Sequence, residues 1–112
     1  MCFTNERIGT IDMVTLSGRL DTEKAEELIV HFDELWDSGS QNSIVLMDSV
    51  NYISSSLIRV LLKSLKKYKA AGGDFSLVGL QPHVINVIKM AGLDSIFTIH
   101  DDKESALQSA SE

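Results

Sequence analysis

The run Ser43-Ile44-Val45-Leu46-Met47 restricts the possible folds of this chain more than any other segment. Four of its five residues are apolar, so it lacks the polar alternation of a strand with one face in water, and it is typical of a strand covered on both faces. Helices usually provide such cover in proteins that alternate strands with helices. We therefore expect an α/β protein with this run at the centre of its sheet.

The flanking segments agree with this expectation. Residues 11–18 largely alternate apolar and polar side chains, which predicts a half-buried strand, and a weaker strand at 2–8 is expected to pair with it through a turn at Gly9. Together with the other periodic segments, these strands predict a mixed, mostly parallel β-sheet with an N-terminal hairpin at one edge and about four α-helices. The remaining predicted strands lie at 75–80 and 96–99, and the helices at 25–36, 57–70, 82–91 and from 101 onward.

The helix ends carry more detailed predictions. Asp21 or Thr22 is expected to cap the first helix, and Asp101 with Glu104 has the spacing of a capping box at the last one. Gly72-Gly73 and Gly92 are expected to end the second and third helices. The buried face of the third helix is predicted to comprise Val84, Ile85, Val87, Ile88 and Ala91.

Size and composition limit the classes of function. The 112 residues suffice for a single domain spanning 1–112, and the net charge of -6 disfavours general binding to nucleic acids. The single cysteine, Cys2, excludes an internal disulfide and suits a reducing cytoplasm. No apolar stretch approaches the roughly 20 residues needed to span a bilayer, and the N-terminus lacks signal-peptide character, so a cytoplasmic protein without direct membrane insertion is expected.

Catalytic and cofactor-binding patterns are missing from the sequence. It contains neither a phosphate-binding loop nor a Gly-x-Ser-x-Gly nucleophile turn. His31, His83 and His100 lack a short metal-ligand spacing, and Asp48 alone does not form a magnesium site. We therefore expect no enzyme activity, no metal and no cofactor.

A basic stripe is predicted on the second helix, because its members are three or four positions apart. One interpretation is a solvated face opposite the apolar side of the helix, and the other is a docking stripe for an acidic partner. The stripe comprises Arg59, Lys63, Lys66 and Lys67.

Three consecutive serines, Ser54, Ser55 and Ser56, stand where a strand and loop lead into that helix. A hydroxyl at this position accepts hydrogen bonds from the free N–H groups of the first turn, and one serine is enough for that purpose. A phosphate placed on another would meet the positive end of the helix, which is favourable by about 0.3–1 kcal/mol. The serine run is therefore compatible with a phosphorylation switch.

At this point the sequence resembles the STAS family, the domain of bacterial anti-sigma factor antagonists and of sulfate-transporter tails. The resemblance extends from about Ile11 to Leu107, and we expect a single STAS domain. Its anchors are the segments 14–21 (Val-Thr-Leu-Ser-Gly-Arg-Leu-Asp), 50–58 (Val-Asn-Tyr-Ile-Ser-Ser-Ser-Leu-Ile), 71–73 (Ala-Gly-Gly) and 77–82 (Leu-Val-Gly-Leu-Gln-Pro).

In this family the second anchor commonly reads Asp-Ser-Ser-Gly-Leu, and a serine kinase phosphorylates its first serine. The resemblance implies Ser55 as the acceptor, with Ser56 as second choice. The sequence departs from the pattern at three positions, with Ser54 in place of Asp, Leu57 in place of Gly, and Leu46 in place of a frequent Asp. Leu57 adds bulk where a partner backbone could need close approach.

The resemblance implies an anti-sigma factor antagonist that binds an anti-sigma factor with serine kinase activity and is inactivated by serine phosphorylation, with a phosphatase as a further possible partner. The alternative is an accessory STAS subunit of an ABC transporter or signalling assembly that is never phosphorylated. The residues expected to bind the partner are Gly18, Arg19, Asp21, Thr22, Ser54, Ser55, Ser56, Leu57, Arg59 and Lys63.

Overall fold

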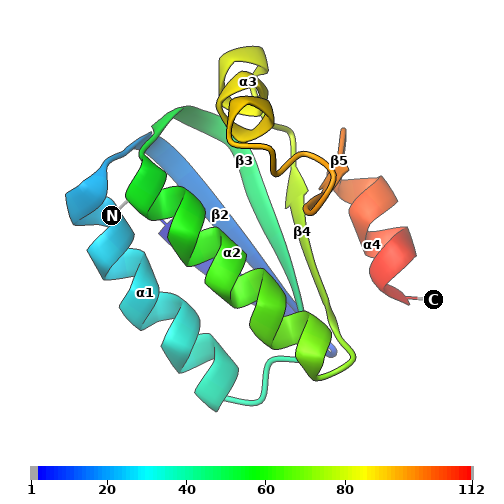
Figure 1. The fold of residues 1–112 in the computed structure, drawn as a ribbon. Coiled ribbons are helices and arrows are strands. Elements are labelled where there is room, and N and C mark those ends of the chain that lie inside the picture. Colours follow the sequence, from blue (N-terminus) through cyan, green and yellow to red (C-terminus); the bar gives the residue numbers. More distant parts are fainter. Residues whose placement is uncertain (1–2, 112) are drawn as a thin grey trace.

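The computed structural model describes residues 3–111, in which one five-stranded sheet carries four helices (Figure 1). The expected strand at 2–8 is observed from Phe3 onward, and Cys2 lies outside the described residues. In chain order the elements are β1 (Phe3–Ile8), β2 (Ile11–Leu20), α1 (Thr22–Asp37), β3 (Asn42–Ile53), α2 (Ser55–Ala70), β4 (Asp74–Val78), α3 (Pro82–Met90), β5 (Thr98–His100) and α4 (Lys103–Ser111).

The strand order is β1-β2-β3-β4-β5, so β3 is the central strand, as predicted from its apolar run. Strands β2 to β5 are parallel to one another, and β1 pairs antiparallel with β2 through a turn in which Gly9 has a φ of 63°. Only glycine adopts such a φ without strain. The predicted mixed sheet with an N-terminal hairpin at one edge is therefore confirmed.

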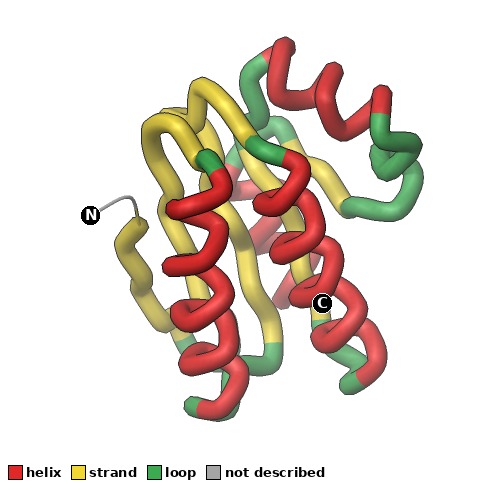
Figure 2. Tube along the Cα trace, turned by 60° about the vertical axis from the view of Figure 1, so that its left-hand side comes forward, coloured by secondary structure: helices red, strands yellow, loops and turns green. Residues whose placement is uncertain are grey.

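The two faces of the sheet pack against different helices. Because side chains alternate along a strand, Val14 and Val45 point to one face, whereas Met13 and Ile44 point to the other. Helices α1 and α2 lie side by side on the first face, and α4 packs on the second through the buried Ala106 (Figures 1 and 2). This two-sided cover explains the apolar character of the central strand.

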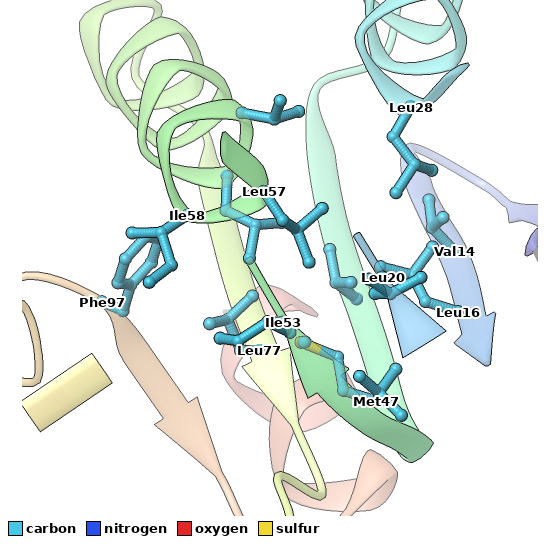
Figure 3. Packing of buried hydrophobic residues seen from close by; sticks show 14 of the residues in the cluster. Val14, Leu16, Leu20, Leu28, Met47, Ile53, Leu57, Ile58, Leu77 and Phe97 are labelled. Atoms are coloured by element: carbon cyan, nitrogen blue, oxygen red, sulfur yellow. The ribbon is translucent and has the colours of Figure 1, made fainter. Parts of the chain in front are cut away.

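The larger core lies between the sheet and helices α1 and α2. Figure 3 shows residues of this cluster converging from the strands, from α2 and from the segment before β5. Its fully buried side chains include Leu16 and Leu20 of β2, Met47 of β3 and Leu57 of α2. Since Leu57 belongs to the first turn of α2, the core reaches to the beginning of that helix.

A buried polar network lies at the other end of the sheet, beside the C-terminal ends of α1 and α2. The Asp12 carboxylate is inaccessible to solvent and accepts two hydrogen bonds from the Arg7 guanidinium, at 2.9 and 3.0 Å. Burial acts to raise the pKa of Asp12, but hydrogen bonds from Arg7, Ser40 and Asn5 outweigh it, and the pKa lies below its ordinary value. The Tyr68 hydroxyl extends the network by donating to the Ser40 oxygen at 2.7 Å.

Strand β3 is longer than predicted, because it continues through Val50 to Ile53. Its second half pairs with the end of β2, where Gly18 aligns with Val50 after one shift in register and Leu20 aligns with Ile53 after a second. Such irregularities bend and twist a strand locally, which weakens the simple alternation by which a strand is recognised in a sequence. The pairing brings the end of β2 beside the beginning of α2.

Four other predictions about the C-terminal half need correction. The strand predicted at 75–80 is Asp74–Val78. The last strand is Thr98–His100 rather than 96–99, and Asp102 rather than Asp101 caps the last helix, with its carboxylate accepting from the Ser105 amide at 2.8 Å. On α3, Val87 and Ala91 are exposed. This short helix packs mainly at one end of β3, so its contact with the core is narrower than the apolar pattern implied.

Candidate functional site

The predicted site lies where β2 and β3 end and helices α1 and α2 begin. The Ser54 amide donates to the Leu20 carbonyl at 2.9 Å, which holds the serine run against the end of β2. Two residues further along each segment, the Thr22 and Ser56 hydroxyl oxygens are 3.5 Å apart. The structure thus brings together two segments that are more than 30 residues apart in the sequence.

The three serines occupy three different environments. Ser54 is buried and precedes the helix, and its hydroxyl oxygen accepts from the Leu57 amide at 3.1 Å, so it is the N-cap of α2. Ser56 is half-buried beside Thr22. Ser55, the first residue of the helix, is exposed, and its hydroxyl makes no hydrogen bond with the described residues.

Two of the residues expected to bind a partner have little or no accessible surface. Leu57 is 0 % exposed, and Figure 3 shows its side chain within the hydrophobic cluster. The expectation that its bulk hinders a partner is therefore wrong for this structure, because the side chain points inward. Ser54 is 8 % exposed and its hydroxyl is used as the cap.

The segment before α1 is held by interactions of its own. Gly18 has a φ of 83°, a conformation that side-chain-bearing residues rarely adopt. The Asp21 carboxylate accepts from the Lys24 amide at 3.0 Å and caps α1, which decides between the two predicted caps. Arg19 is exposed, with its guanidinium carbon 3.9 Å from the centre of the Tyr52 ring, a cation–π contact that adds an aromatic surface to the site.

Tyr52 was not among the predicted site residues, although Arg19 and Tyr52 both belong to the segments that carried the resemblance. An aromatic residue at an exposed strand position next to the serine run is the signal that could have indicated it. That signal became readable only when the register of β2 with β3 was known, because Arg19 aligns with Tyr52 in the parallel pairing.

The basic stripe on α2 divides into two parts. Lys67 donates to the Asp33 carboxylate of α1 at 3.2 Å, so it serves the contact between the two helices. Arg59, Lys63 and Lys66 are exposed, and within residues 3–111 none of them makes an ion pair. The free part of the stripe is thus the part closer to the serines.

A groove of about 280 Å³ separates α1 from α2 directly below the serines. Its walls include Thr22 and Ser56 at one end, and further along the apolar Ile29 and the basic Arg59 and Lys63. This groove was not predicted from the sequence, because no local pattern indicates how two helices that are distant in the sequence pack against each other.

We also searched the part of the chain that the structure describes for a metal site, for the position of a predicted histidine and for a membrane-spanning helix. No group of three or more histidine, cysteine, aspartate or glutamate residues comes together there as a metal site. His31 lies against Phe3, with ring centroids 4.3 Å apart, and burial lowers the pKa of its imidazole. Over residues 3–111, no helix has both the length and the apolar character required to cross a membrane.

Comparisons with known proteins agree with this arrangement. The sequence profile of the STAS domain matches residues 3–106. BtrV of Bordetella bronchiseptica, whose name describes it as a candidate anti-sigma factor antagonist, is 29% identical over 106 residues, covering 95% of this chain and 91% of the relative.

Two solved structures show the same fold. A crystal structure of a candidate anti-sigma factor antagonist from Thermotoga maritima superposes with a TM-score of 0.92 at 24% identity, covering 98% of this chain and 95% of the other. The phosphorylated form of SpoIIAA, a cell fate determinant from Bacillus, gives a TM-score of 0.75 at 17% identity, covering 96% and 98%. The four helices and five-stranded mixed sheet are those of these structures.

Proposed function

This chain belongs to the STAS domain family, and we propose that it acts as an anti-sigma factor antagonist that is switched by serine phosphorylation. In the unmodified state it binds an anti-sigma factor with serine kinase activity and thereby releases a sigma factor. The chain is then a binding protein rather than an enzyme, and the catalytic groups belong to its partner. A phosphatase that restores the unmodified serine would complete the cycle.

The observation that carries this proposal is the difference between the serines. Ser54 is committed to capping α2 and Ser56 is half-buried beside Thr22, whereas Ser55 offers an exposed hydroxyl without a partner among the described residues. A kinase must reach the oxygen that attacks ATP, and Ser55 meets that condition best. We therefore propose Ser55 as the phosphoacceptor, with Ser56 as second choice.

The proposed binding surface surrounds Ser55. It combines the loop at the end of β2 with the exposed side of the first two turns of α2. We exclude the Leu57 side chain from it because that side chain is buried, and we include Ser54 only through its backbone. The surface comprises Gly18, Arg19, Thr22, Ser55, Ser56, Arg59 and Lys63, with Asp21 shaping the loop as the cap of α1.

Phosphorylation would end binding through charge. A phosphoserine adds about −1.5 to −2 charges at neutral pH, and these would be buried at the centre of the interface. An unpaired charge in a desolvated contact costs several kcal/mol, and each ~1.4 kcal/mol lowers affinity about tenfold. In the free protein the same phosphate lies at the positive end of α2, where it is tolerated.

The alternative of an accessory subunit that is never phosphorylated rested on departures from the family pattern. Serine caps a helix about as well as aspartate, so Ser54 retains the local structure in place of the acid. Leu57 is buried, so having leucine here in place of the usual glycine adds no side chain to the exposed surface. Neither substitution removes the accessible hydroxyl, and we therefore favour the antagonist.

The test is phosphate transfer from ATP by the purified cognate anti-sigma factor kinase. We expect the wild-type chain and Ser56→Ala to incorporate phosphate and Ser55→Ala to lose incorporation. Equal incorporation in Ser55→Ala would contradict the assignment of the acceptor.

Binding of the same kinase is measured separately with Ser55→Asp, which should weaken it by about tenfold or more. Ser105→Asp is the matched control, since Ser105 is an exposed serine in the first turn of α4, far from this surface. An unchanged affinity of Ser55→Asp would argue against the proposed interface.

A further inference from the structure

The groove between α1 and α2 has a regular construction. The two helices run in parallel, and two polar pairs between them have partners that are separated by 34 residues in the sequence. The separation is the same at both ends of the contact, where Thr22 meets Ser56 at 3.5 Å and Asp33 meets Lys67 at 3.2 Å. Polar pairs thus bring the helices together at both ends.

The residues between these ends do not form such pairs. At the same separation in the sequence, a charged residue of the groove on one helix corresponds to an apolar residue on the other. Lys63, one turn before Lys67, corresponds to Ile29, one turn before Asp33, so α1 has no acid at this position. The mismatched pairs are Ala25 with Arg59, Glu26 with Val60, and Ile29 with Lys63, and all six residues line the groove.

The mismatch leaves both apolar surface and charge without a partner. Ile29 is 39 % exposed, although it lies on the side of α1 that faces α2. Arg59 and Lys63 make no ion pair within residues 3–111, and one acid, Glu26, shares the groove with these two cations. The groove therefore has an apolar floor and a net positive rim.

We infer that this groove is a docking socket for a segment of a partner protein in which a large apolar side chain stands next to a carboxylate. The apolar side chain would cover Ile29 and Val60, and the carboxylate would pair with Arg59 and Lys63. Interfaces commonly derive most of their affinity from one or two anchors of this kind in a pocket.

The position of the groove favours a protein segment over a small molecule. It shares Thr22 and Ser56 with the proposed phosphorylation surface, so a single partner could occupy both. Identifying that partner as the anti-sigma factor rests on the proposed function, whereas the chemistry of the socket does not.

Ile29→Asp tests the socket by supplying the acid that the register lacks. The new carboxylate would stand opposite Lys63 as Asp33 stands opposite Lys67, replacing the apolar floor and neutralising the rim. Val30→Asp is the matched control, because Val30 is the next residue, is 57 % exposed and does not line the groove. Circular dichroism would verify that both variants are folded.

The probe is a synthetic peptide in which leucine and phenylalanine are flanked by glutamates, titrated into the ¹⁵N-labelled chain. We expect saturable shifts of amide signals confined to residues 22–29 and 56–63, about tenfold weaker binding in Ile29→Asp and less than about twofold change in Val30→Asp. Equal binding of a peptide with lysines in place of the glutamates, or equal binding by Ile29→Asp, would overturn the inference. Octanoate binding as tightly as the peptide would instead identify a small-molecule site.

The purified anti-sigma factor kinase provides a second measurement. If it binds the wild-type chain, Ile29→Asp should weaken that binding about tenfold while Val30→Asp does not. Equal binding by Ile29→Asp would overturn the socket as part of this interface and leave the proposed function standing. A kinase that does not bind the wild-type chain would overturn the proposed function, and the peptide titration would then decide on the socket alone.

Discussion

Replacing Leu57 by glycine restores the residue that the family pattern usually has at this position, and we expect it to destabilise this protein severely. Leu57 is fully buried in the first turn of α2 and lies within the main hydrophobic cluster (Figure 3). From the sequence alone, the leucine was expected mainly to hinder the close approach of a partner protein. The structure makes its side chain a part of the core.

The magnitude follows from two contributions. Truncating a buried leucine to alanine costs about 2–5 kcal/mol, because apolar contacts are lost and a cavity remains. Glycine in place of alanine within a helix costs about 0.5–1 kcal/mol more. Together they amount to about 2.5–6 kcal/mol, a large part of the roughly 5–15 kcal/mol by which a domain is stable.

The assay is urea denaturation followed by the fluorescence of Trp36, the single tryptophan of the chain, and by circular dichroism. The matched control is Ser55→Gly, which introduces glycine two positions earlier at an exposed side chain and should cost about 1 kcal/mol or less. A loss below about 1 kcal/mol in Leu57→Gly would refute the packing argument.

Two further predictions concern the cap of α2 and the buried acid. Ser54→Ala should lower the free energy of unfolding by about 1 kcal/mol in urea denaturation, while Ser54→Asp should retain the cap and most of the stability; equal losses in both variants would contradict the capping role of Ser54. Asp12 has a folded-state pKa below its ordinary value of 3.8, so its contribution to stability should be complete above about pH 4 and decline as the pH falls through the folded-state pKa. Denaturation at a series of acidic pH values should show a shallower decline for Asp12→Asn, and identical slopes would show that the Arg7–Asp12 pair is not responsible.

Much of the fold was predictable because its signals are local. The apolar run of β3 predicted the central strand, the spacing of apolar residues located α1 and α2, and Gly9 marked the hairpin turn. Each signal depends on residues within about four positions, the range over which helix and strand periodicity acts. Where long-range pairing modified the local pattern, as in the extension of β3 to Ile53 and the displacement of β5, the strand boundaries could not be predicted correctly from the sequence.

The serine run illustrates which properties of the site can be predicted from neighbouring residues and which cannot. Local patterns in the sequence were enough to place three hydroxyls at the beginning of a helix, to show that one suffices as a cap, and to relate the surrounding residues to the STAS family. The folded arrangement was needed to show that Ser54 is the cap, that Ser55 is exposed and that Leu57 points into the core. It was also needed to show that Ile29 and Lys63 line the same groove. This difference arises because accessibility depends on side chains from distant segments, which come together only when the sheet and both helices are packed.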